Sequence, residues 1–426
     1  MWSTSLTLAC GATVAAFVLI PRFVQLRRQR REIRLRSGAH TATRPLGPHS
    51  GVRVTVLGQG GAPIGDLYKN IDDVTALTTI ATAHENQIQF FDTSPWYGVG
   101  LSEMRVGLAL HRLQRSSFIV QTKVGRYLVP DRDGVNGTKV GWVGGLHMGI
   151  RFDYSGAAFE RQLEDSLQRT GLGHIDSLVI HDLEPTPHRD VATGDNGVAT
   201  ACRHLETLNA SGFAALQRMR AEGRIRAFGA GINIDEDGED PETKRLWNRE
   251  YFGALMRMQS APSPSSSSPP SAGAPAESLA RGLDFVLLAN MHSLLNNEAN
   301  ELGILDECAV RGVSVVVGGP FSTGILATGA DPPGGAVPNY NYLPASDRVR
   351  AHTRRLESVC KRHGVPLIAA ALQYPLRHPA VSCVIPGGAS PREVASNVVL
   401  MNVPIPEALW RDMEAEMLLP PPVGLR

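Results

Sequence analysis

From residue 52 onward, short apolar runs alternate with longer segments of helical periodicity. The longer segments carry apolar residues at i, i+3 and i+4 spacing, as at Val74, Leu77 and Ile80. Strands that alternate strictly with helices pair in parallel through right-handed crossovers. Eight apolar runs have the length of strands: 52–57, 88–91, 118–120, 177–180, 225–228, 285–288, 313–317 and 381–385. This pattern predicts an α/β fold, a single (β/α)8 TIM barrel.

An open, doubly wound sheet is the alternative for such an alternation. It would carry a glycine-rich dinucleotide fingerprint between its first strand and first helix. Residues 58–65 hold glycines at a suitable density, but Pro63 stands where the helix should present free N–H groups. We therefore interpret residues 58–65 as a turn at the barrel mouth.

The first 50 residues differ from the rest of the chain. Residues 5–20 carry no charge, and a cluster of arginines follows them. This order favours a signal anchor that leaves the following chain on the cytosolic side of a membrane. Because a bilayer span asks for about 20 apolar residues, an imported mitochondrial or plastid presequence is the alternative. We expect a leader over 1–50 with a membrane tether through 5–24, and no secretion.

A second unusual segment, 260–276, contains seven Ser and five Pro. Such a composition does not form a packed element, so we predict a disordered insert. The strand and helix rhythm resumes after it. We therefore expect one domain over 51–426, with long mouth loops at 131–156, 186–212 and 328–346.

Charge and cysteine content narrow the class of function. The net charge of +1 hides eight Arg and a single acid, Glu32, in the first 50 residues, so the body of the chain is slightly acidic. A nucleic-acid groove needs clustered Lys and Arg, so nucleic acid is not an expected partner. Five widely spaced cysteines form neither a disulfide framework nor a metal knuckle. We expect a reducing compartment and no metal, while the oligomeric state stays open.

Polar residues with catalytic chemistry follow three successive apolar runs. Asp92 ends the second run, Lys123 follows the third and His181 follows the fourth, with Tyr97 shortly after Asp92. TIM-barrel active sites lie at the C-terminal ends of the strands. We therefore expect these four side chains to meet at one site.

Together the four residues predict a device for proton transfer. A lysine about 4 Å from a tyrosine would lower its pKa from ~10 toward neutral, by roughly 3 units. Asp92 would orient Lys123, and His181 would bind the substrate oxygen. Proton transfer at an oxygen accompanies hydride transfer at its carbon, which needs a nicotinamide partner.

The sequence resembles an aldo-keto reductase from about residue 52 to 403. The motif FDTSPWYGVGLSE holds Asp92 and Tyr97 at the family's spacing, and Lys123 and His181 complete its catalytic tetrad. The branch with D-threo-aldose (L-fucose), L-galactose and pyridoxal dehydrogenases is the most similar. The segments behind this choice are GGAPIGDLY, RFDYS, IHDLEPTPH, GAGIN and GGPFSTGILA.

The resemblance implies a nicotinamide cofactor across the barrel mouth. It implies that Gly60 and Gly61 lie near the nicotinamide ribose and that Asn233 binds the carboxamide. Segment 320–326 would surround the pyrophosphate, and residues 387–397 the adenosine end. The implied contacts there are Pro320, Phe321, Ser322, Gly324, Leu326, Gly387, Ser390, Arg392 and Asn397.

The sequence departs from the family at the adenosine end. Ala389 and Ser390 replace the usual Arg-Ser, and Ala395 and Ser396 replace a later Arg and Glu. A 2′-phosphate needs a fork of cationic donors, for which Arg392 is the available substitute. We therefore expect NAD, with NADP as the alternative.

These observations predict an enzyme that oxidises an aldose of the L-galactose, L-fucose or D-arabinose type at C1, with Tyr97 as general acid and base. Trp96 and His292 are the candidate substrate contacts. One alternative is an NADPH-dependent aldehyde, ketone or pyridoxal-type oxidoreductase. Another is a membrane-tethered regulatory subunit that senses nicotinamide redox state.

Overall fold

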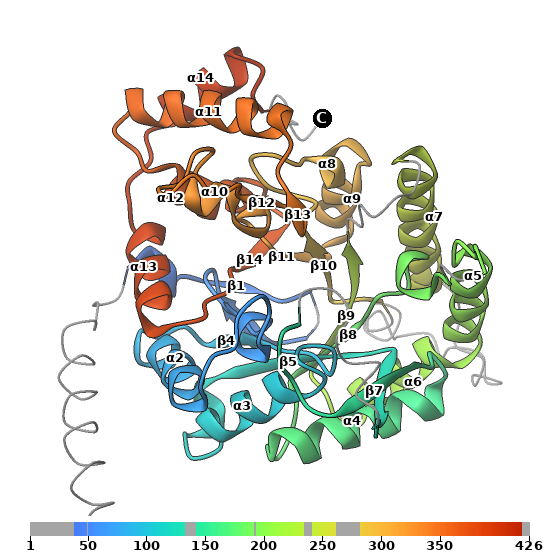
Figure 1. The fold of residues 1–426 in the computed structure, drawn as a ribbon. Helices are drawn as coiled ribbons and strands as arrows, with labels where there is room; N and C mark the ends of the chain where they lie inside the picture. Colours follow the sequence, from blue (N-terminus) through green and yellow to red (C-terminus); the bar gives the residue numbers. More distant parts are fainter. Residues whose placement is uncertain are drawn as a thin grey trace, which may run out of the picture.

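Eight parallel strands surrounded by helices form a barrel (Figure 1), as the alternation of strands and helices predicts. In this computed structural model the described residues are 38–48, 50–132, 142–190, 193–233, 241–260 and 282–419. The strands neighbour one another in chain order. They are β3 (Gln59–Gly60), β4 (Phe90–Asp92), β5 (Ile119–Val124), β8 (Ser177–Ile180), β9 (Ala227–Asn233), β10 (Phe285–Ala289), β11 (Ser314–Gly318) and β14 (Val381–Ile385).

The barrel closes between its first and last strands. Leu57 pairs with Val384 and Gly60 pairs with Gly387, both in parallel. At Gly58 a Cβ atom would lie 2.7 Å from Ile385 Cγ2, so glycine is needed where the two strands meet.

The prediction of the first strand over 52–57 was wrong. Residues Arg53–Thr55 form β2, which pairs antiparallel with β1 (Thr43–Pro45). Val52 and Val54 pack into the interior of the barrel from its N-terminal end. Alternating apolar residues fit a hairpin that fills the end of the barrel as well as they fit a barrel strand. The sequence pattern therefore did not distinguish the two structures.

The first barrel strand follows this hairpin directly. Residues 59–60 belong to β3, although we predicted a turn over 58–65, and only Pro63–Gly65 forms a short 3-10 helix, η2. We placed the boundary between leader and barrel at residue 50. The hairpin of β1 and β2 crosses this boundary, because β1 precedes residue 50 and β2 follows it. The structure describes the chain from residue 38.

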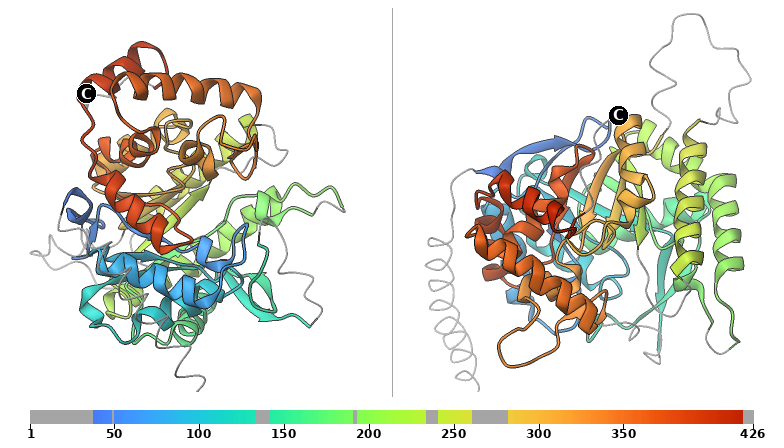
Figure 2. Two further views of the ribbon diagram at one scale, coloured as in Figure 1. Left: turned by 60° about the vertical axis from the view of Figure 1, so that its left-hand side comes forward. Right: turned by 90° about the horizontal axis from the view of Figure 1, so that it is seen from above.

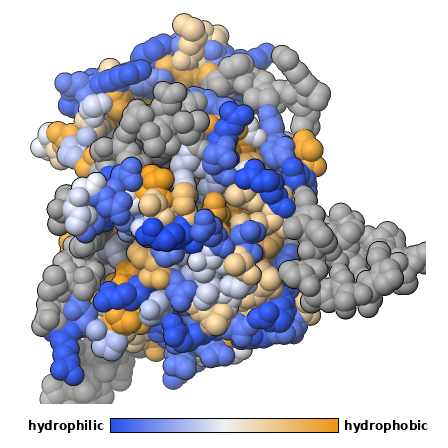
Figure 3. Space-filling model, turned by 90° about the vertical axis from the view of Figure 1, so that its right-hand side faces the viewer, coloured by the Kyte–Doolittle hydropathy of each residue, from blue (hydrophilic) through white to orange (hydrophobic). Residues whose placement is uncertain are grey.

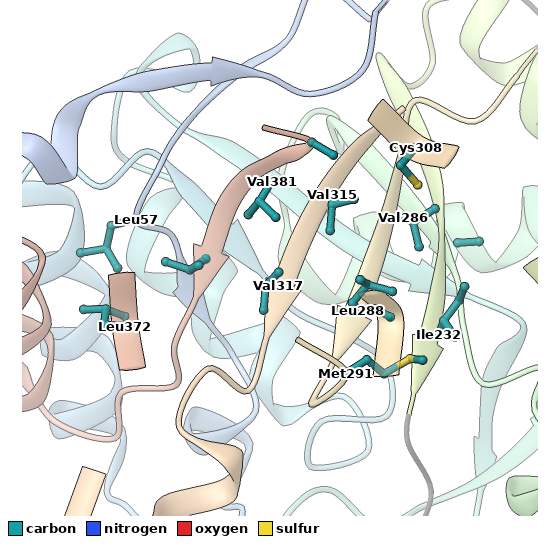
Figure 4. Packing of buried hydrophobic residues seen from close by; sticks show 14 of the residues in the cluster. Leu57, Ile232, Val286, Leu288, Met291, Cys308, Val315, Val317, Leu372 and Val381 are labelled. Atoms are coloured by element: carbon teal, nitrogen blue, oxygen red, sulfur yellow. The ribbon is translucent and has the colours of Figure 1, made fainter. Parts of the chain in front are cut away.

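Helices cover the outside of the strands, as two further views show (Figure 2). Apolar side chains of the strands and helices fill the layer between them, including Val286, Leu288 and Leu372 (Figure 4). Asp72 caps the first helix by accepting from Thr75 N. The helices are α2 (Asp73–Glu85), α3 (Leu101–Leu110), α4 (Gly156–Thr170), α5 (Val198–Thr207), α6 (Phe213–Ala221), α7 (Pro241–Ser260), α8 (Glu298–Glu301), α9 (Ile304–Arg311), α10 (Ile325–Thr328), α11 (Asp347–Arg362), α12 (Leu367–Gln373), α13 (Pro391–Met401) and α14 (Glu407–Ala415).

The predicted mouth loops contain structure of their own. Antiparallel pairs form between β6 (Arg126–Pro130) and β7 (Met148–Phe152), and between β12 (Asn339–Tyr340) and β13 (Leu343–Pro344). The surface mixes hydrophilic and hydrophobic residues on the face in Figure 3. No helix within the described ranges combines the length and apolar character of a membrane span. The expected tether at 5–24 and the insert from residue 261 lie outside these ranges.

Candidate active site

A buried ion pair joins the second and third barrel strands. Lys123 Nζ lies 2.7 Å from Oδ1 and 2.9 Å from Oδ2 of Asp92. The same ammonium group donates to the carbonyl oxygen of Thr93 at 2.8 Å. The side chains are 1% and 2% exposed, so water does not screen the pair.

Strand register explains how this pair forms. Asp92 ends β4 and pairs with Gln121 of β5. Side chains two residues apart in a strand share one side, so Gln121 and Lys123 point the same way. Gln121 Nε2 donates to Asp92 Oδ1 at 2.7 Å. The sequence analysis did not predict Gln121 as a site residue, although it stands two positions before Lys123 and so shares its side of the strand.

Tyr97 lies above the ion pair. Lys123 Nζ sits 4.5 Å from the centroid of the Tyr97 ring, and the Tyr97 hydroxyl donates to Asp92 Oδ2 at 3.5 Å. The His181 ring meets the Tyr97 ring edge to face, with centroids 6.4 Å apart. The structure therefore brings the four residues together.

The pKa of Tyr97 shifts opposite to our expectation. Burial raises the pKa of Tyr97 well above its usual value, and the nearby Asp92 carboxylate adds to the increase. Burial also lowers the pKa of Lys123, against the influence of Asp92. Asp92 neutralises Lys123, so the ammonium does not offset the effect of burial on the pKa of Tyr97.

Asp182 adds a second buried carboxylate beside His181. Its Oδ2 forms an ion pair with Arg126 and lies 3.3 Å from His181 Nδ1. Its Oδ1 accepts a hydrogen bond from Asn233 Nδ2 at 2.8 Å. Asp182 and Arg126 were missed in the sequence. The only signal for Asp182 was its place directly after His181.

Aromatic side chains form one wall of the site. The Arg126 guanidinium lies 4.4 Å from the ring centroid of Trp96 and 4.8 Å from that of Phe152. Trp142 contacts both Trp96 and Tyr97, with ring centroids 5.7 and 5.8 Å apart. Trp96 thus borders the tetrad, while Trp142 was not predicted.

Comparison with known proteins identifies the family. The profile of the Aldo/keto reductase family matches residues 56–236 and 268–416. The chain belongs to the aldo-keto reductase family. This confirms the predicted family, and the barrel of eight parallel strands confirms the predicted fold class.

Three curated relatives of this aldo-keto reductase are dehydrogenases. Pyridoxal 4-dehydrogenase from Microbacterium luteolum is 32% identical, over 88% of this chain and 97% of that protein. D-threo-aldose 1-dehydrogenase from Pseudomonas sp is 28% identical, over 90% and 100% of the two chains. L-galactose dehydrogenase from Arabidopsis thaliana is also 28% identical, over 84% and 88%.

Solved structures share the fold of this aldo-keto reductase. Glycerol dehydrogenase from Gluconobacter oxydans matches 91% of this chain and 99% of its own, with a TM-score of 0.59 at 19% identity. An aldo-keto reductase from Bacillus halodurans matches 88% of this chain and 96% of its own, with a TM-score of 0.57 at 23% identity. At these identities the likeness shows the fold alone.

Membership of the family implies a nicotinamide cofactor, and the strand ends fit one. Asn233, at the end of β9, is held by Asp182 and through its own N–H by Glu184 Oε1 at 2.8 Å. The Asn290 Oδ1 atom, after the neighbouring strand β10, is buried and accepts no hydrogen bond from the described residues. A carboxamide suits such a set, because it both donates and accepts.

Barrel packing accounts for the two predicted ribose glycines. A Cβ atom at Gly60 would lie 2.9 Å from the carbonyl oxygen of Ile385, and one at Gly61 would lie 2.4 Å from that of Asp92. These positions need glycine with or without a cofactor. Their contact with the ribose stays a prediction.

The segment after β11, where the pyrophosphate is predicted, begins with a tight turn. Ser322 and Thr323 adopt positive φ angles of 48° and 59°. Ser322 Oγ lies 2.9 Å from Ser293 Oγ, which fixes the hydroxyl in place. Ser322 N donates to the carbonyl oxygen of Gly319 at 2.9 Å, and Gly324 N donates to that of Phe321 at 3.0 Å. Around this turn lie Pro320, Gly324 and the buried Leu326, with Phe321 half-buried. Contact between this turn and the pyrophosphate stays a prediction.

The N-terminus of α13 carries the predicted adenosine contacts. Ser390 caps the helix by accepting from Glu393 N. Arg392 is exposed, Asn397 is buried and Gly387 pairs with Gly60. Glu393 Oε2 accepts from Ala389 N at 2.8 Å, so a carboxylate sits at this helix end.

His292 lies in a different environment from the tetrad. Its side chain is buried, and its ring packs against that of Tyr374, with centroids 5.2 Å apart. Tyr374 in turn contacts Trp410 of α14. These contacts describe a packed core histidine, and contact with substrate stays a prediction.

Proposed function

We propose that this aldo-keto reductase oxidises a cyclic aldose at C1 and releases the lactone, with NAD as the hydride acceptor. The observation that carries the proposal is the meeting of Tyr97 and His181 beside the buried pair of Asp92 and Lys123. Two relatives bear the names of aldose dehydrogenases. An aldose of the L-galactose, L-fucose or D-arabinose type is therefore the first substrate class to test.

The tetrad provides a fixed frame for the reacting oxygen. Lys123 contacts the Tyr97 ring face and Asp92 accepts from its hydroxyl, so Tyr97 is held from two sides. Tyr97 and His181 then supply two polar groups for one substrate oxygen. When bound, the nicotinamide accepts the hydride from C1. The protein's own task is to orient the C–H and O–H bonds that break.

The aromatic wall supports a polyhydroxylated ring as substrate. Trp96, Tyr97 and Trp142 offer ring faces, which pack against the C–H groups of a sugar. The Trp142 Nε1 atom is buried and donates to no group among the described residues. It is therefore a candidate donor for a sugar hydroxyl, because a buried N–H needs a partner.

Pyridoxal is a second candidate substrate. The relative at 32% identity is named pyridoxal 4-dehydrogenase. Pyridoxal closes into a cyclic hemiacetal, so its oxidation gives a lactone by the same hydride and proton transfers. The aromatic wall also suits a flat pyridine ring.

Two substrate panels test these functions. The protein is mixed with NAD and a set of L- and D-aldoses plus pyridoxal, and reduced nicotinamide is followed by its absorbance. A second panel pairs NADPH with aldehydes and ketones. We expect oxidation of a small group of aldoses. Faster NADPH-dependent reduction would instead indicate a general carbonyl reductase. No turnover in either panel, with a partner that copurifies from detergent extracts, would indicate a nicotinamide-sensing regulatory subunit.

The α13 N-terminus supports NAD over NADP. The Glu393 carboxylate is already bonded to Ala389 N at the helix end where the adenosine ribose is expected. A carboxylate repels a 2′-phosphate but accepts hydrogen bonds from ribose hydroxyls. Ala389 and Ala395 add no cation. NAD is therefore the cofactor that this helix end favours.

The leader carries a separate proposal about location. We propose that residues 5–24 tether the barrel to a membrane with the barrel on the cytosolic side. Sequencing the N-terminus of the mature protein tests this. A start after residue 30 would indicate a cleaved organelle presequence instead.

A further inference from the structure

The Tyr154 hydroxyl lies between two carbonyl groups at the end of barrel strand β8. It is 2.7 Å from the carbonyl oxygen of His181 and 2.7 Å from that of Asp182. Tyr154 is fully buried, and so nearly are His181 and Asp182. A buried carbonyl needs a donor, and a hydroxyl has a single hydrogen, so the two oxygens share it.

The two carbonyl groups converge because the chain leaves the strand at Asp182. His181 N still donates to the carbonyl oxygen of Val124 at 2.9 Å, so His181 continues the pairing of β8 with β5. Asp182 then adopts a φ of 51°, a left-handed conformation that is uncommon for residues other than glycine. Such a conformation persists where surrounding contacts require it, and the hydrogen bond from Tyr154 is one of those contacts.

Tyr154 is itself held by elements outside the tetrad. It stands directly before Ser155, which caps α4. A Cβ atom at Gly125 would lie 2.5 Å from Tyr154 Cε1, and one at Gly212 would lie 2.2 Å from the Tyr154 carbonyl oxygen. Glycine at these positions lets the end of β5 and the π-helical turn η5 (Leu208–Gly212) pack against the tyrosine. The hydroxyl therefore projects from a closely packed frame.

We propose that Tyr154 is a positioning residue that directs the His181 ring toward the reacting oxygen. Its hydroxyl binds two successive peptide groups, those that follow His181 and Asp182. The Cα–Cβ bond of His181 follows this main chain, and so does the place of the ring beside Tyr97. The identity of the reacting oxygen rests on the proposed function above, while the contact of Tyr154 with the main chain does not.

The His181 ring depends on this main-chain segment. Its Nδ1 atom forms no hydrogen bond with a described residue, and the nearest charged atom is Asp182 Oδ2 at 3.3 Å. Asp182 belongs to the same segment, so Tyr154 fixes both the ring and the carboxylate beside it. Loss of the hydroxyl would leave two buried carbonyls without this donor, and the segment would shift toward another partner.

Nuclear magnetic resonance of protein with isotope-labelled histidine tests the place of the ring without any turnover. The full chain is used, and His181→Gln identifies the His181 signal by its loss. Tyr154→Phe keeps the aromatic ring and removes only the hydroxyl. We expect the His181 signal to shift or split in this variant. An unchanged signal would overturn the proposal.

Tyr251→Phe is the matched control. Tyr251 is also fully buried, and its hydroxyl forms no hydrogen bond with a described residue. The variant removes the same atom from a similar environment but leaves Tyr154 on its two carbonyls. We expect the His181 signal to match that of the wild type. A shift as large as in Tyr154→Phe would overturn the proposal, because loss of any buried hydroxyl would then explain it.

Kinetics test whether Tyr154 acts through His181. In single turnovers, Tyr154→Phe should slow hydride transfer by about 10- to 10²-fold, the cost of misplacing a group that orients the substrate, while cofactor affinity persists. In the His181→Gln background the same substitution should have little further effect, because the ring that it positions is absent. Equal losses in both backgrounds would indicate a purely structural role and overturn the proposal.

A failure of the proposed function remains distinguishable from a failure of this role. If neither substrate panel gives turnover, the proposed function fails. The His181 signal in Tyr154→Phe and Tyr251→Phe then still decides the role of Tyr154, because it needs no substrate.

Discussion

Lys123 Nζ lies within 2.9 Å of both carboxylate oxygens of Asp92, in a site where both side chains are almost fully buried. Burial of two charges is costly, and their mutual attraction offsets that cost only while both are present. The pair therefore links the stability of the barrel to the position of Tyr97, which contacts both members.

Asp92→Asn should destabilise the protein because it leaves Lys123 buried without a counterion. We expect the free energy of unfolding to fall by about 3–5 kcal/mol, measured by urea denaturation. The double variant Asp92→Asn, Lys123→Met removes both charges and should regain part of the free energy of unfolding. It should remain inactive, because Lys123 and Asp92 no longer hold Tyr97. Equal stability of the single variant and the wild type would contradict this reading.

Tyr97→Phe should lower kcat by about 10²- to 10⁴-fold while cofactor affinity persists. The substitution keeps the ring that Lys123 and His181 contact and removes only the hydroxyl. Turnover with saturating substrate and cofactor titration by NADH fluorescence measure the two effects. Near-normal turnover would rule out contact between this hydroxyl and the reacting oxygen.

Glu393→Arg should shift cofactor preference toward NADP, because it replaces a carboxylate by a cation at the α13 N-terminus. We expect the ratio of kcat/KM for NADP to that for NAD to rise at least tenfold. Glu393→Gln is the control: its amide oxygen keeps the bond to Ala389 N without the charge, so its ratio should lie between the other two. An unchanged ratio in Glu393→Arg would place the ribose elsewhere.

Stability should fall in acid because of buried histidines. Burial lowers the pKa of His292 to about 4, so His292 stays neutral in the folded protein while the unfolded chain binds a proton below about pH 6.5. The stabilisation that neutral His292 gives to the folded state is complete above that pH. As the pH falls toward 4 it is lost, and the free energy of unfolding falls by up to roughly 1.4 kcal/mol per pH unit. Unfolding free energies measured across this range give the slope.

His292→Phe isolates this effect from those of the other histidines. Phenylalanine keeps an aromatic ring against Tyr374 but does not titrate. We expect a flatter loss of stability between about pH 6 and 4.5 than in the wild type. If the free energy of unfolding fell with the same slope in both proteins, His292 would bind its proton in the folded state as readily as in the unfolded chain, which contradicts the prediction.

The order of the barrel strands and the meeting of the tetrad were predictable from local pattern. Seven of the eight predicted runs overlap barrel strands, and apolar runs interleaved with helices favour a parallel sheet. Asp92, Lys123 and His181 each follow such a run, and the C-terminal ends of parallel strands lie at one face. No knowledge of long-range contacts was needed.

Two parts of the fold and site depended on contacts far apart in sequence. Val52 and Val54 stand at alternate positions, as in a barrel strand, but their segment pairs with β1 and fills the end of the barrel. The sequence pattern shows that they are buried and does not show which strand they pair with. The direction of the Tyr97 pKa shift depended first on the burial of its side chain and then on the Asp92 carboxylate beside it.

By itself, the sequence determined the barrel, the family and the four residues that meet at its mouth. Only the tertiary structure decided the environment of those residues: which carboxylate neutralises Lys123, and which one faces His181. The physical reason is that hydrophobic periodicity is local, whereas the energy of a buried charge depends on every charge packed around it.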